Sequence, residues 1–311
     1  MAKVVFMGAP EYALPSLEVL HDQHEIVLVV TQPDRRSGRG RKVSFSPVKA
    51  FALDHDLPLW QPKTLRGVDA LDRLQAARGE VYVTAAIGLL LTAEILALPA
   101  HGCVNVHASL LPRWRGAAPV SAAILNGDAE TGVTLMRTDA GMDTGPILAQ
   151  VRCPIEPDDT TASLTPRLAQ LGADLLAESL PRLISGDLVP QPQPEEGATY
   201  ARRLEKTDGL IDWSRSAAHV ERMVRAFTPW PSAHTTFQGQ GLKVLRAQVL
   251  PTWSGSKSPG SVFVLPDKRI AVATGKGALI LHEIQLAGRK AMSPDIFCRG
   301  SNDFVGATLG E

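Results

Sequence analysis

Short apolar runs alternate with stretches of helical periodicity along residues 1–150. The apolar runs lie at residues 4–7, 26–30, 81–86 and 103–106. Residues 48–55 follow Ser46 and Pro47, an order typical of a helix that Ser caps and Pro begins. Runs that are apolar at every position indicate strands buried on both faces, as in a parallel sheet covered by helices. The sequence therefore predicts a doubly wound, mostly parallel, Rossmann-like α/β sheet.

The pattern of apolar positions changes at residue 133. Strand-like segments at 133–136 and 147–151 flank a glycine-rich loop, and a long helical stretch follows at 160–183. Two neighbouring strands joined by such a loop, followed by a helix, would complete the first domain.

A proline-rich stretch divides the chain in two. Prolines alternate with glutamines at the start of residues 190–206, which is typical of a stiff, extended linker. A helix at 216–227 follows, and short β-rich segments come after it. These segments lie at 233–237, 242–250, 260–264, 270–274 and 278–284. Their spacing predicts a small, OB-like β-barrel at 207–311, after a first domain at 1–189.

The composition is that of an ordinary globular protein. Of the 311 residues, 44% are apolar and 21% are charged, which is enough apolar surface for two folded domains. No apolar run reaches about 18 residues, so we expect no membrane span. The strand at 4–7 begins almost at the first methionine, which leaves no room for a signal or transit peptide. Three scattered cysteines give no disulfide framework and no metal site, and a cytoplasmic protein is predicted.

The net charge of zero hides a segregation of charge along the chain. Residues 1–200 carry 17 basic and 23 acidic side chains, whereas residues 201–311 carry 15 basic and 9 acidic side chains. A basic C-terminal part is expected where a polyanion is bound, although an excess of this size also occurs in proteins without such a partner. Charge alone therefore leaves a nucleic-acid partner open.

Two polar side chains close the fourth apolar run. Asn105 and His107 are two residues apart on the predicted strand, so both point to the same face of the sheet. They lie at the carboxyl end of the strand, where open α/β sheets bind ligands. An amide and an imidazole side by side can donate hydrogen bonds to a developing oxyanion. The same spacing also fits a structural pair that ends the strand.

The glycine-rich loop between the two later strands carries two carboxylates. Asp139, Gly141, Asp143 and Gly145 lie in it, and glycines allow close backbone approach. Asp143 is a candidate for handling a proton or for orienting His107. A hairpin turn built from Asp and Gly explains the loop equally well when it is considered alone.

A phosphate-binding loop is not expected after the first strand. The turn there contains Gly8, Ala9 and Pro10, with a single glycine and a proline that lacks a backbone N–H. The glycine pattern of dinucleotide-binding folds is therefore missing, and the ligand of the sheet should be something else.

A basic loop follows the second apolar run, on the same edge of the sheet as Asn105. Five of residues 35–42 are basic, namely Arg35, Arg36, Arg39, Arg41 and Lys42. The functional interpretation is contact with nucleic-acid phosphates beside the site. The ordinary alternative for a run of charge is a solvated loop.

Taken together, these segments resemble the methionyl-tRNA formyltransferases along nearly the whole chain. The matching segments are residues 5–8, 31–35, 38–40, 46–49, 104–119, 127–134, 143–145, 211–213, 225–227 and 229–231. The set of Asn105, His107 and Asp143 with the Ser-Leu-Leu-Pro run at 109–112 is similar to the wider 10-formyltetrahydrofolate-dependent transferases. Residues 113–119, the Arg-Gly loop and the C-terminal motifs resemble the tRNA-specific branch.

The resemblance implies formyl transfer from 10-formyltetrahydrofolate, as co-substrate and without a metal, to the α-amino group of initiator methionyl-tRNA. Asn105 and His107 would stabilise the negative oxygen of the tetrahedral intermediate, and Asp143 would organise the proton transfer that follows. An ordinary α-amino group has a pKa of about 8, so no strong base is needed to expose the attacking amine. The resemblance makes 1–189 the catalytic domain and 207–311 the tRNA-binding barrel of an enzyme expected to be monomeric.

The resemblance also assigns binding residues. The folate site would be lined by Ser109, Leu110, Leu111, Pro112, Ile87, Asp139 and Gly141. The basic loop, through Arg35, Arg36, Arg39, Arg41 and Lys42, would contact the tRNA acceptor end, with Arg39 as the main contact. Two positions depart from the family pattern, because Ile87 stands where tyrosine is common and Thr92 where proline is common. The shape of the folate pocket is the property that these departures put in question.

Two other functions compete with this interpretation. A folate-dependent formyltransferase that acts on a nucleotide-linked amino sugar could have similar length, but the basic loop and basic C-terminal part would then lack a role. An enzyme acting on a glycinamide ribotide would resemble only the first domain. A catalytically silent RNA-binding protein would not need the complete set of Asn105, His107 and Asp143.

Overall fold

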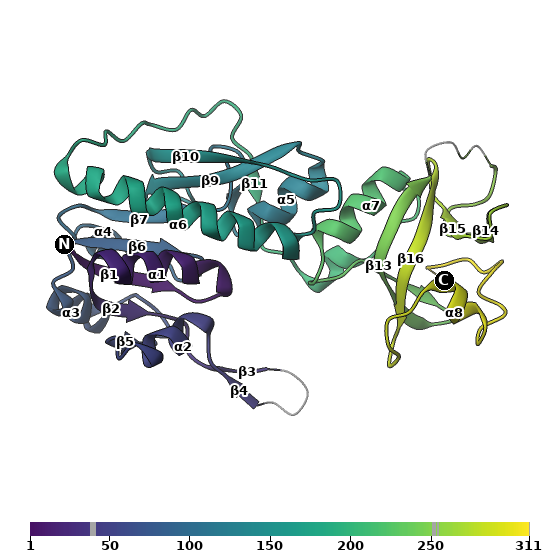
Figure 1. The fold of residues 1–311 in the computed structure, drawn as a ribbon, viewed down its shortest axis with the longest axis horizontal. Coiled ribbons are helices and arrows are strands. Elements are labelled where there is room, and N and C mark those ends of the chain that lie inside the picture. The colour runs from purple at the N-terminus through teal and green to yellow at the C-terminus, as the bar shows by residue number, and fades with distance from the viewer. Residues whose placement is uncertain (38–41, 251–252, 254, 311) are drawn as a thin grey trace. The chain divides into compact units, whose positions relative to one another are not determined.

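The computed structural model describes residues 1–37, 42–250, 253 and 255–310. The chain forms two compact units, each of which combines segments that are separate in the sequence (Figure 1). The first comprises Met1–Pro119, Glu130–Pro154 and Leu164–Arg202, and the second comprises Val120–Ala129, Ile155–Ser163 and Arg203–Glu311. Much of the proline-rich stretch thus belongs to the first unit. The contiguous domain limits expected from the sequence remain a prediction.

The first unit is built around a seven-stranded mixed sheet. In spatial order its strands are β10 (Ile147–Pro154), β9 (Glu130–Arg137), β7 (Cys103–His107), β6 (Val81–Ala85), β1 (Lys3–Gly8), β2 (Glu25–Val30) and β5 (Leu59–Trp60). The strands from β7 to β5 are parallel, whereas β9 and β10 are antiparallel at one edge. Because β1, β2, β6 and β7 coincide with the four predicted runs, the Rossmann-like fold is confirmed.

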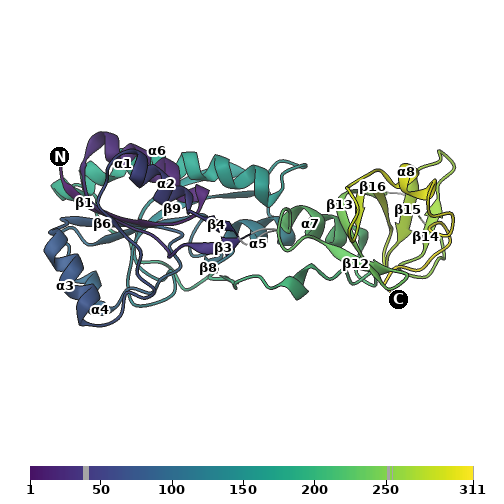
Figure 2. The same ribbon diagram turned by 90° about the horizontal axis from the view of Figure 1, so that it is seen from below.

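Helices cover both faces of this sheet. Figure 2 shows α1, α2 and α6 on one face, with α3 and α4 on the other. Their bounds, with the short helix that precedes α1, are η1 (Glu11–Ala13), α1 (Leu14–Gln23), α2 (Pro47–Asp54), α3 (Val68–Ala77), α4 (Ala93–Leu96) and α6 (Thr161–Ser185). Every residue of β6 is buried between these layers, which is why its sequence is apolar at nearly every position. Ser46 caps α2 as predicted, because its hydroxyl accepts a hydrogen bond from Lys49 N at 3.1 Å.

The chain changes direction across the sheet at β1. From β1 it proceeds to β2 and β5 on one side, and then returns to β6 and β7 on the other side. Ligands of open α/β folds bind at the carboxyl ends of the strands around such a switch point. Gly8 ends β1 at this edge, and a Cβ on it would lie 2.8 Å from Ala13 Cβ. Close packing against η1 therefore explains this glycine.

The proline-rich stretch runs along the first unit. Gln191 exchanges backbone hydrogen bonds with Ile147 of the edge strand β10. Further along, β11 (Tyr200–Ala201) pairs in parallel with β8 (Arg115–Gly116), which follows β7 in the chain. These contacts fix the stretch to the unit at two places, and a turn closed by the bond from Ala198 N to Glu195 O lies between them.

The second unit contains a five-stranded antiparallel sheet. In spatial order its strands are β12 (His234–Phe237), β13 (Gln240–Leu250), β16 (Ala278–Leu286), β15 (Ile270–Ala273) and β14 (Val262–Val264). Irregularities on both sides of Arg246 bend the longest strand, and the curled sheet agrees with the small barrel-like domain that the sequence predicts. Helical segments α5 (Pro119–Asn126), η2 (Lys206–Gly209), α7 (Ala217–Ala226) and α8 (Pro294–Cys298) complete the assignment.

A short hairpin stands where the sequence predicts the basic loop. Its strands β3 (Arg35–Ser37) and β4 (Lys42–Ser44) are antiparallel, with Ser37 opposite Lys42. The tip, which holds Arg39 and Arg41, lies outside the described residues.

Candidate active site

The candidate site lies at the carboxyl end of β7, and it begins with Asn105. This residue pairs in register with Thr84 of β6, whose hydroxyl donates a hydrogen bond to Asn105 Oδ1 at 3.0 Å. Since Oδ1 accepts this bond, the amide nitrogen of Asn105 is the atom left to face the loop that follows β9. The predicted amide donor is therefore oriented by the neighbouring parallel strand.

Asp143 brings the predicted residues together. Its backbone has a φ of 53°, the left-handed region that Asp tolerates better than most side chains. Asn105 Nδ2 donates to Asp143 Oδ1 at 3.3 Å, and the backbone N–H of Gly116 donates to Asp143 Oδ2 at 2.8 Å. His107 Nδ1 lies 3.7 Å from the same Oδ2. One carboxylate thus lies among an amide, an imidazole and a backbone donor.

The hydrogen bonds of His107 define what its ring can do. Its Nε2 lies 2.9 Å from the carbonyl oxygen of Trp114, which can only accept, so Nε2 carries a proton. Nδ1 is then the ring atom left to act, and it faces Asp143. The neutral ring offers a lone pair there, whereas the imidazolium offers an N–H whose charge the carboxylate balances. His107 can therefore donate to an oxyanion only as the cation.

Gly116 supplies a backbone contact that no side chain could replace. Its φ is 108°, and a Cβ on it would lie 2.6 Å from the carbonyl oxygen of Ala201. The absence of a side chain lets β8 and β11 approach, and this approach holds the Gly116 N–H against Asp143. The geometry of the carboxylate therefore depends on the pairing of the proline-rich stretch with β8.

We expect the substitution Gly116→Ala to lower the free energy of unfolding by about 2 kcal/mol or more, because strain and a close backbone contact add. The same change should lower kcat, since the donor to Asp143 shifts. Gly186→Ala is the matched control, because Gly186 has a φ of 87° and nothing within 4 Å of the added Cβ. Denaturant unfolding and steady-state rates check both; equal destabilisation by the two variants would contradict the role of the Ala201 contact.

The residues predicted to bind folate differ in their accessibility. Ser109, Leu111 and Ile87 are buried, so they can shape a pocket only from behind. Leu110 and Pro112 are half-buried, and Asp139 and Gly141 are exposed. The last four therefore remain available for direct contact with a ligand.

The 109–112 turn is held by hydrogen bonds to side chains of the strands β9 and β10. Thr134 Oγ1 donates to Ser109 O at 2.6 Å and accepts from Leu111 N at 3.1 Å, while Gln150 Nε2 donates to Leu111 O at 2.9 Å. Asp139 similarly closes the loop that bears Asp143, because it accepts hydrogen bonds from Gly141 N and from a nearby threonine. Hydrogen bonds within the protein therefore hold both segments.

Only part of the predicted tRNA-binding set is described. Arg35, Arg36 and Lys42 belong to the hairpin strands β3 and β4. The base of the hairpin is fixed by Asp34, which accepts hydrogen bonds from Lys49 Nζ at 2.6 Å and Gln61 Nε2 at 2.8 Å. These bonds, the one from Lys49 foremost, lower the pKa of the Asp34 carboxyl. The acidic anchor therefore keeps its charge at neutral pH.

Four residues of the site were missed by the sequence analysis. Thr84 orients Asn105, Trp114 fixes His107, Gly116 donates to Asp143, and Gln193 binds the Asp143 backbone. Two of these act through backbone atoms, which leave no signature in residue type. The signal that was available for Thr84 is a hydroxyl in an otherwise apolar strand beside Asn105.

Neither a metal cluster nor a membrane helix is found in the described part of the chain. No three His, Cys, Asp or Glu side chains among those residues are grouped so as to hold a metal ion. Within the same ranges, no helix has the length and apolar character needed to cross a membrane.

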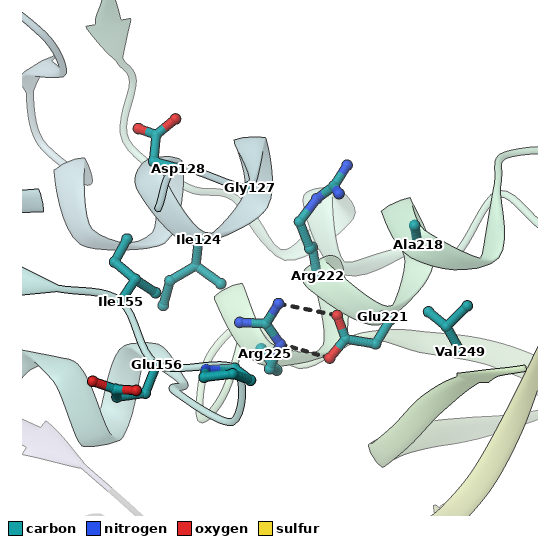
Figure 3. Close-up of a pocket in the computed structure, with 11 residues that line it drawn as sticks. Ile124, Gly127, Asp128, Ile155, Glu156, Ala218, Glu221, Arg222, Arg225 and Val249 are labelled. Carbon is teal, nitrogen blue, oxygen red and sulfur yellow. Dashed lines mark hydrogen bonds and ion pairs between the residues drawn. The ribbon is translucent and has the colours of Figure 1, made fainter. Parts of the chain in front are cut away.

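A cavity of about 260 Å³ lies in the second unit, beside α7 (Figure 3). The two arginines that line the cavity both bind other groups of the protein. Arg225 forms a two-pronged ion pair with Glu221, at 2.6 and 3.0 Å, and Arg222 Nε donates to the Leu125 carbonyl at 3.0 Å. We interpret this cavity as part of the joint between α5 and α7.

Comparison with known families matches both parts of the chain. The model of the formyl transferase family matches residues 2–180, and the model of the formyl transferase C-terminal domain matches residues 203–302. The first match alone includes all the candidate site residues named above except Gln193, which lies beyond residue 180.

Individual relatives match over nearly the whole chain. A methionyl-tRNA formyltransferase of Hydrogenovibrio crunogenus is 45% identical over 99% of this chain and 98% of its own length. One of Myxococcus xanthus is 48% identical over 96% of this chain and 95% of its own length. Among solved structures, an N-formyltransferase of Helicobacter canadensis in complex with folinic acid and dTDP-3-aminofucose has a TM-score of 0.69 at 19% identity, covering 90% of this chain and 99% of that one. The last likeness shows the fold alone.

Proposed function

The chain belongs to the methionyl-tRNA formyltransferase family, and from this premise we propose that it transfers the formyl group of 10-formyltetrahydrofolate to the α-amino group of initiator methionyl-tRNA. The observation that carries the assignment to these residues is the meeting of Asn105, His107 and the Gly116 N–H at one carboxylate, that of Asp143. The enzyme acts in the cytoplasm as a monomer, with catalysis in 1–189, a linker at 190–206 and tRNA binding by 207–311.

The oxygen of the formyl group gains negative charge when the amine attacks. Asn105 supports this step through its amide nitrogen, which carries two hydrogens and has a long bond of 3.3 Å to Asp143. His107 supports it through Nδ1, which lies 3.7 Å from Asp143 Oδ2. Donors fixed before the reaction stabilise the transition state without reorganisation.

The attacking nitrogen must lose a proton, and the nitrogen of the departing folate must gain one. Asp143 is the acceptor at the centre of the site, and its partners Asn105 and Gly116 hold both carboxylate oxygens in place. It moves the proton directly or through a water molecule, which is ordinary work for a positioned carboxylate. No metal is needed for this sequence of steps.

A folate-derived formyl donor is supported by the formyl transferase family model and by a structural neighbour that binds folinic acid. We propose that its pterin lies against Leu110, Pro112, Asp139 and Gly141, with Ser109, Leu111 and Ile87 behind them. The accessible and buried positions of these residues fit this division.

The tRNA acceptor end is proposed to bind the basic loop through Arg35, Arg36, Arg39, Arg41 and Lys42. We expect Arg39→Ala to raise KM for tRNA about tenfold, the effect of losing one charge-assisted hydrogen bond. KM for folate should not change.

Steady-state kinetics at several salt concentrations check the Arg39 prediction, because a lost phosphate contact also reduces the salt dependence by about one ion. Arg182→Ala, an exposed arginine in the last turn of α6, is the control and should leave both constants unchanged. Equal weakening of folate and tRNA would contradict the proposed role of the loop.

A transfer assay tests the proposed function as a whole. Purified protein with 10-formyltetrahydrofolate should formylate initiator methionyl-tRNA, discriminate against elongator methionyl-tRNA, and leave nucleotide-linked amino sugars unmodified. Formylation of the sugar instead of the tRNA would favour the alternative substrate. Binding of tRNA without any transfer would contradict the assignment of a catalytic role to Asp143.

A further inference from the structure

Gln193, in the proline-rich stretch, contacts the backbone on both sides of the turn that presents Asp143. Its Nε2 donates to the Asp143 carbonyl at 2.9 Å and to the Gly145 carbonyl at 2.7 Å. Its Oε1 accepts a hydrogen bond from Arg115 Nε at 3.1 Å. Every strong hydrogen-bonding group of this amide is therefore used, and two of its three bonds end on residues 143–145.

The orientation of the Gln193 amide is determined by its partners. Arg115 can only donate, so the oxygen of the amide must face it, and the nitrogen must then face the two carbonyls. Arg115 is itself among the largest fully buried side chains, so it offers a fixed reference point. The Gln193 amide thus links the buried Arg115 side chain to the backbone of the Asp143 turn.

Arg115 has few other strong partners. Its Nη1 lies 3.5 Å from the Tyr200 hydroxyl and 3.8 Å from Glu195 Oε2, and the Glu195 side chain is 87% exposed. Its Nη2 is buried and has no hydrogen-bond partner among the described residues. The bond from Nε to Gln193 is therefore the shortest that its guanidinium makes to a neighbouring side chain of the proline-rich stretch.

The Asp143 turn needs an external support. Asp143 occupies the left-handed region, which is less favourable for a residue with a side chain, and Gly145 is packed so closely that a Cβ would lie 1.8 Å from Arg137 O. Hydrogen bonds within the loop involve Asp139, but they do not reach the Asp143 carbonyl. Gln193 supplies that support from a segment about 50 residues away, with separations of 50 and 48 residues for the two bonds.

We propose that Gln193 is a positioning residue for the reaction: it fixes the backbone of residues 143–145, so that the Asp143 carboxylate keeps its place beside Asn105 and His107. The proposal rests on the proposed function of Asp143. It also gives the proline-rich stretch a part in catalysis besides joining two domains.

The variant Gln193→Met tests the proposal, since Met has a similar length and neither donates nor accepts strongly. We expect kcat to fall about tenfold or more, because small displacements of a reacting group are costly. KM for folate and for tRNA should change less than about twofold, because the proposal gives Gln193 no part in binding either substrate. Gln191→Met is the matched control. Gln191 is exposed on the same stretch, and among the described residues its amide reaches only Val189 O, at 3.4 Å, so kcat should not change.

The variant Gln193→Glu separates support of the Asp143 turn from support of Arg115. A carboxylate would still accept from Arg115, and more strongly, but it could not donate to the two carbonyls. We expect Gln193→Glu to lose at least as much kcat as Gln193→Met. Wild-type activity of Gln193→Glu would show that only the Arg115 contact matters and would overturn the proposal.

A double-mutant cycle in the full chain combines Gln193→Met with Asp143→Asn. Single-turnover rates are measured at saturating substrates. If Gln193 acts through Asp143, adding Gln193→Met to Asp143→Asn should lower the rate by less than about threefold. A further loss as large as in the wild-type background would overturn the proposal, because it would indicate general damage to the fold. Full activity of Asp143→Asn alone would contradict the proposed function of Asp143. Normal activity of Gln193→Met together with an inactive Asp143→Asn would instead contradict the positioning role of Gln193.

Discussion

Replacing Asp143 by asparagine should lower kcat by about 10³-fold while leaving tRNA binding nearly unchanged. The carboxylate accepts hydrogen bonds on both oxygens, from Asn105 and from the Gly116 N–H, and it faces His107 Nδ1. An amide has one accepting oxygen, carries no charge to balance the imidazolium, and cannot take a proton from the attacking amine. Three contributions are therefore lost together in a side chain of the same shape.

Rates of formyl transfer and equilibrium binding of methionyl-tRNA, measured on the same preparations, check the Asp143→Asn prediction. Asp187→Asn is a suitable control, because this carboxylate lies beyond the end of α6 and accepts from the Ser185 hydroxyl. It should retain full activity. If the affinity for tRNA fell in parallel with kcat, Asp143 would be a binding residue and the proposed role would be wrong.

Replacing His107 by alanine should lower kcat by about 10²–10³-fold, the usual cost of removing one donor to an oxyanion. The ring is buried, and its orientation is fixed by the bond from Nε2 to the Trp114 carbonyl. Its loss removes the Nδ1 donor and leaves the Asp143 carboxylate without the ring that lies 3.7 Å from it.

The control for His107 lies at the other end of the same strand. His101 precedes β7. Its backbone N–H donates to the Glu80 carbonyl, and its carbonyl accepts from Arg137 Nη2, so these contacts do not use its ring. His101→Ala should therefore leave kcat unchanged while testing for general damage near β7. Thermal unfolding of both variants, with KM for tRNA as a second readout, distinguishes lost chemistry from lost folding; an active His107→Ala enzyme would contradict the oxyanion role.

The predictable part of the fold came from local patterns. Residues 4–7 and 81–86 are apolar at nearly every position because β1 and β6 are buried between two helical layers, and this burial is visible in composition. Ser46 marked the start of α2 because capping needs only neighbouring residues. By contrast, β8 and β11 are two-residue strands whose pairing joins residues 85 apart, and no local pattern predicts such a contact.

The candidate site was predictable where chemistry is carried by side chains in a repeating geometry. Asn105 and His107 lie two residues apart on one strand, so their common face followed from the pleat. The contribution of Asp143 was a hypothesis, since a carboxylate in a glycine-rich loop fits a simple turn equally well. The structure brings it into contact with Asn105 and beside His107, and its role in the reaction stays a prediction.

The sequence by itself determined the doubly wound sheet, the family, and the residue types at the carboxyl end of β7, because apolar periodicity and motif spacing are local properties of the chain. Only the tertiary structure decided how these residues meet. Thr84 orients Asn105, the Trp114 carbonyl leaves His107 one free nitrogen, and Gly116 and Gln193 fix Asp143. Apart from the contact of His107 with Trp114, these contacts join segments distant in sequence. Several of them use backbone atoms, and a backbone N–H or carbonyl is the same at every residue until the fold gives it a direction.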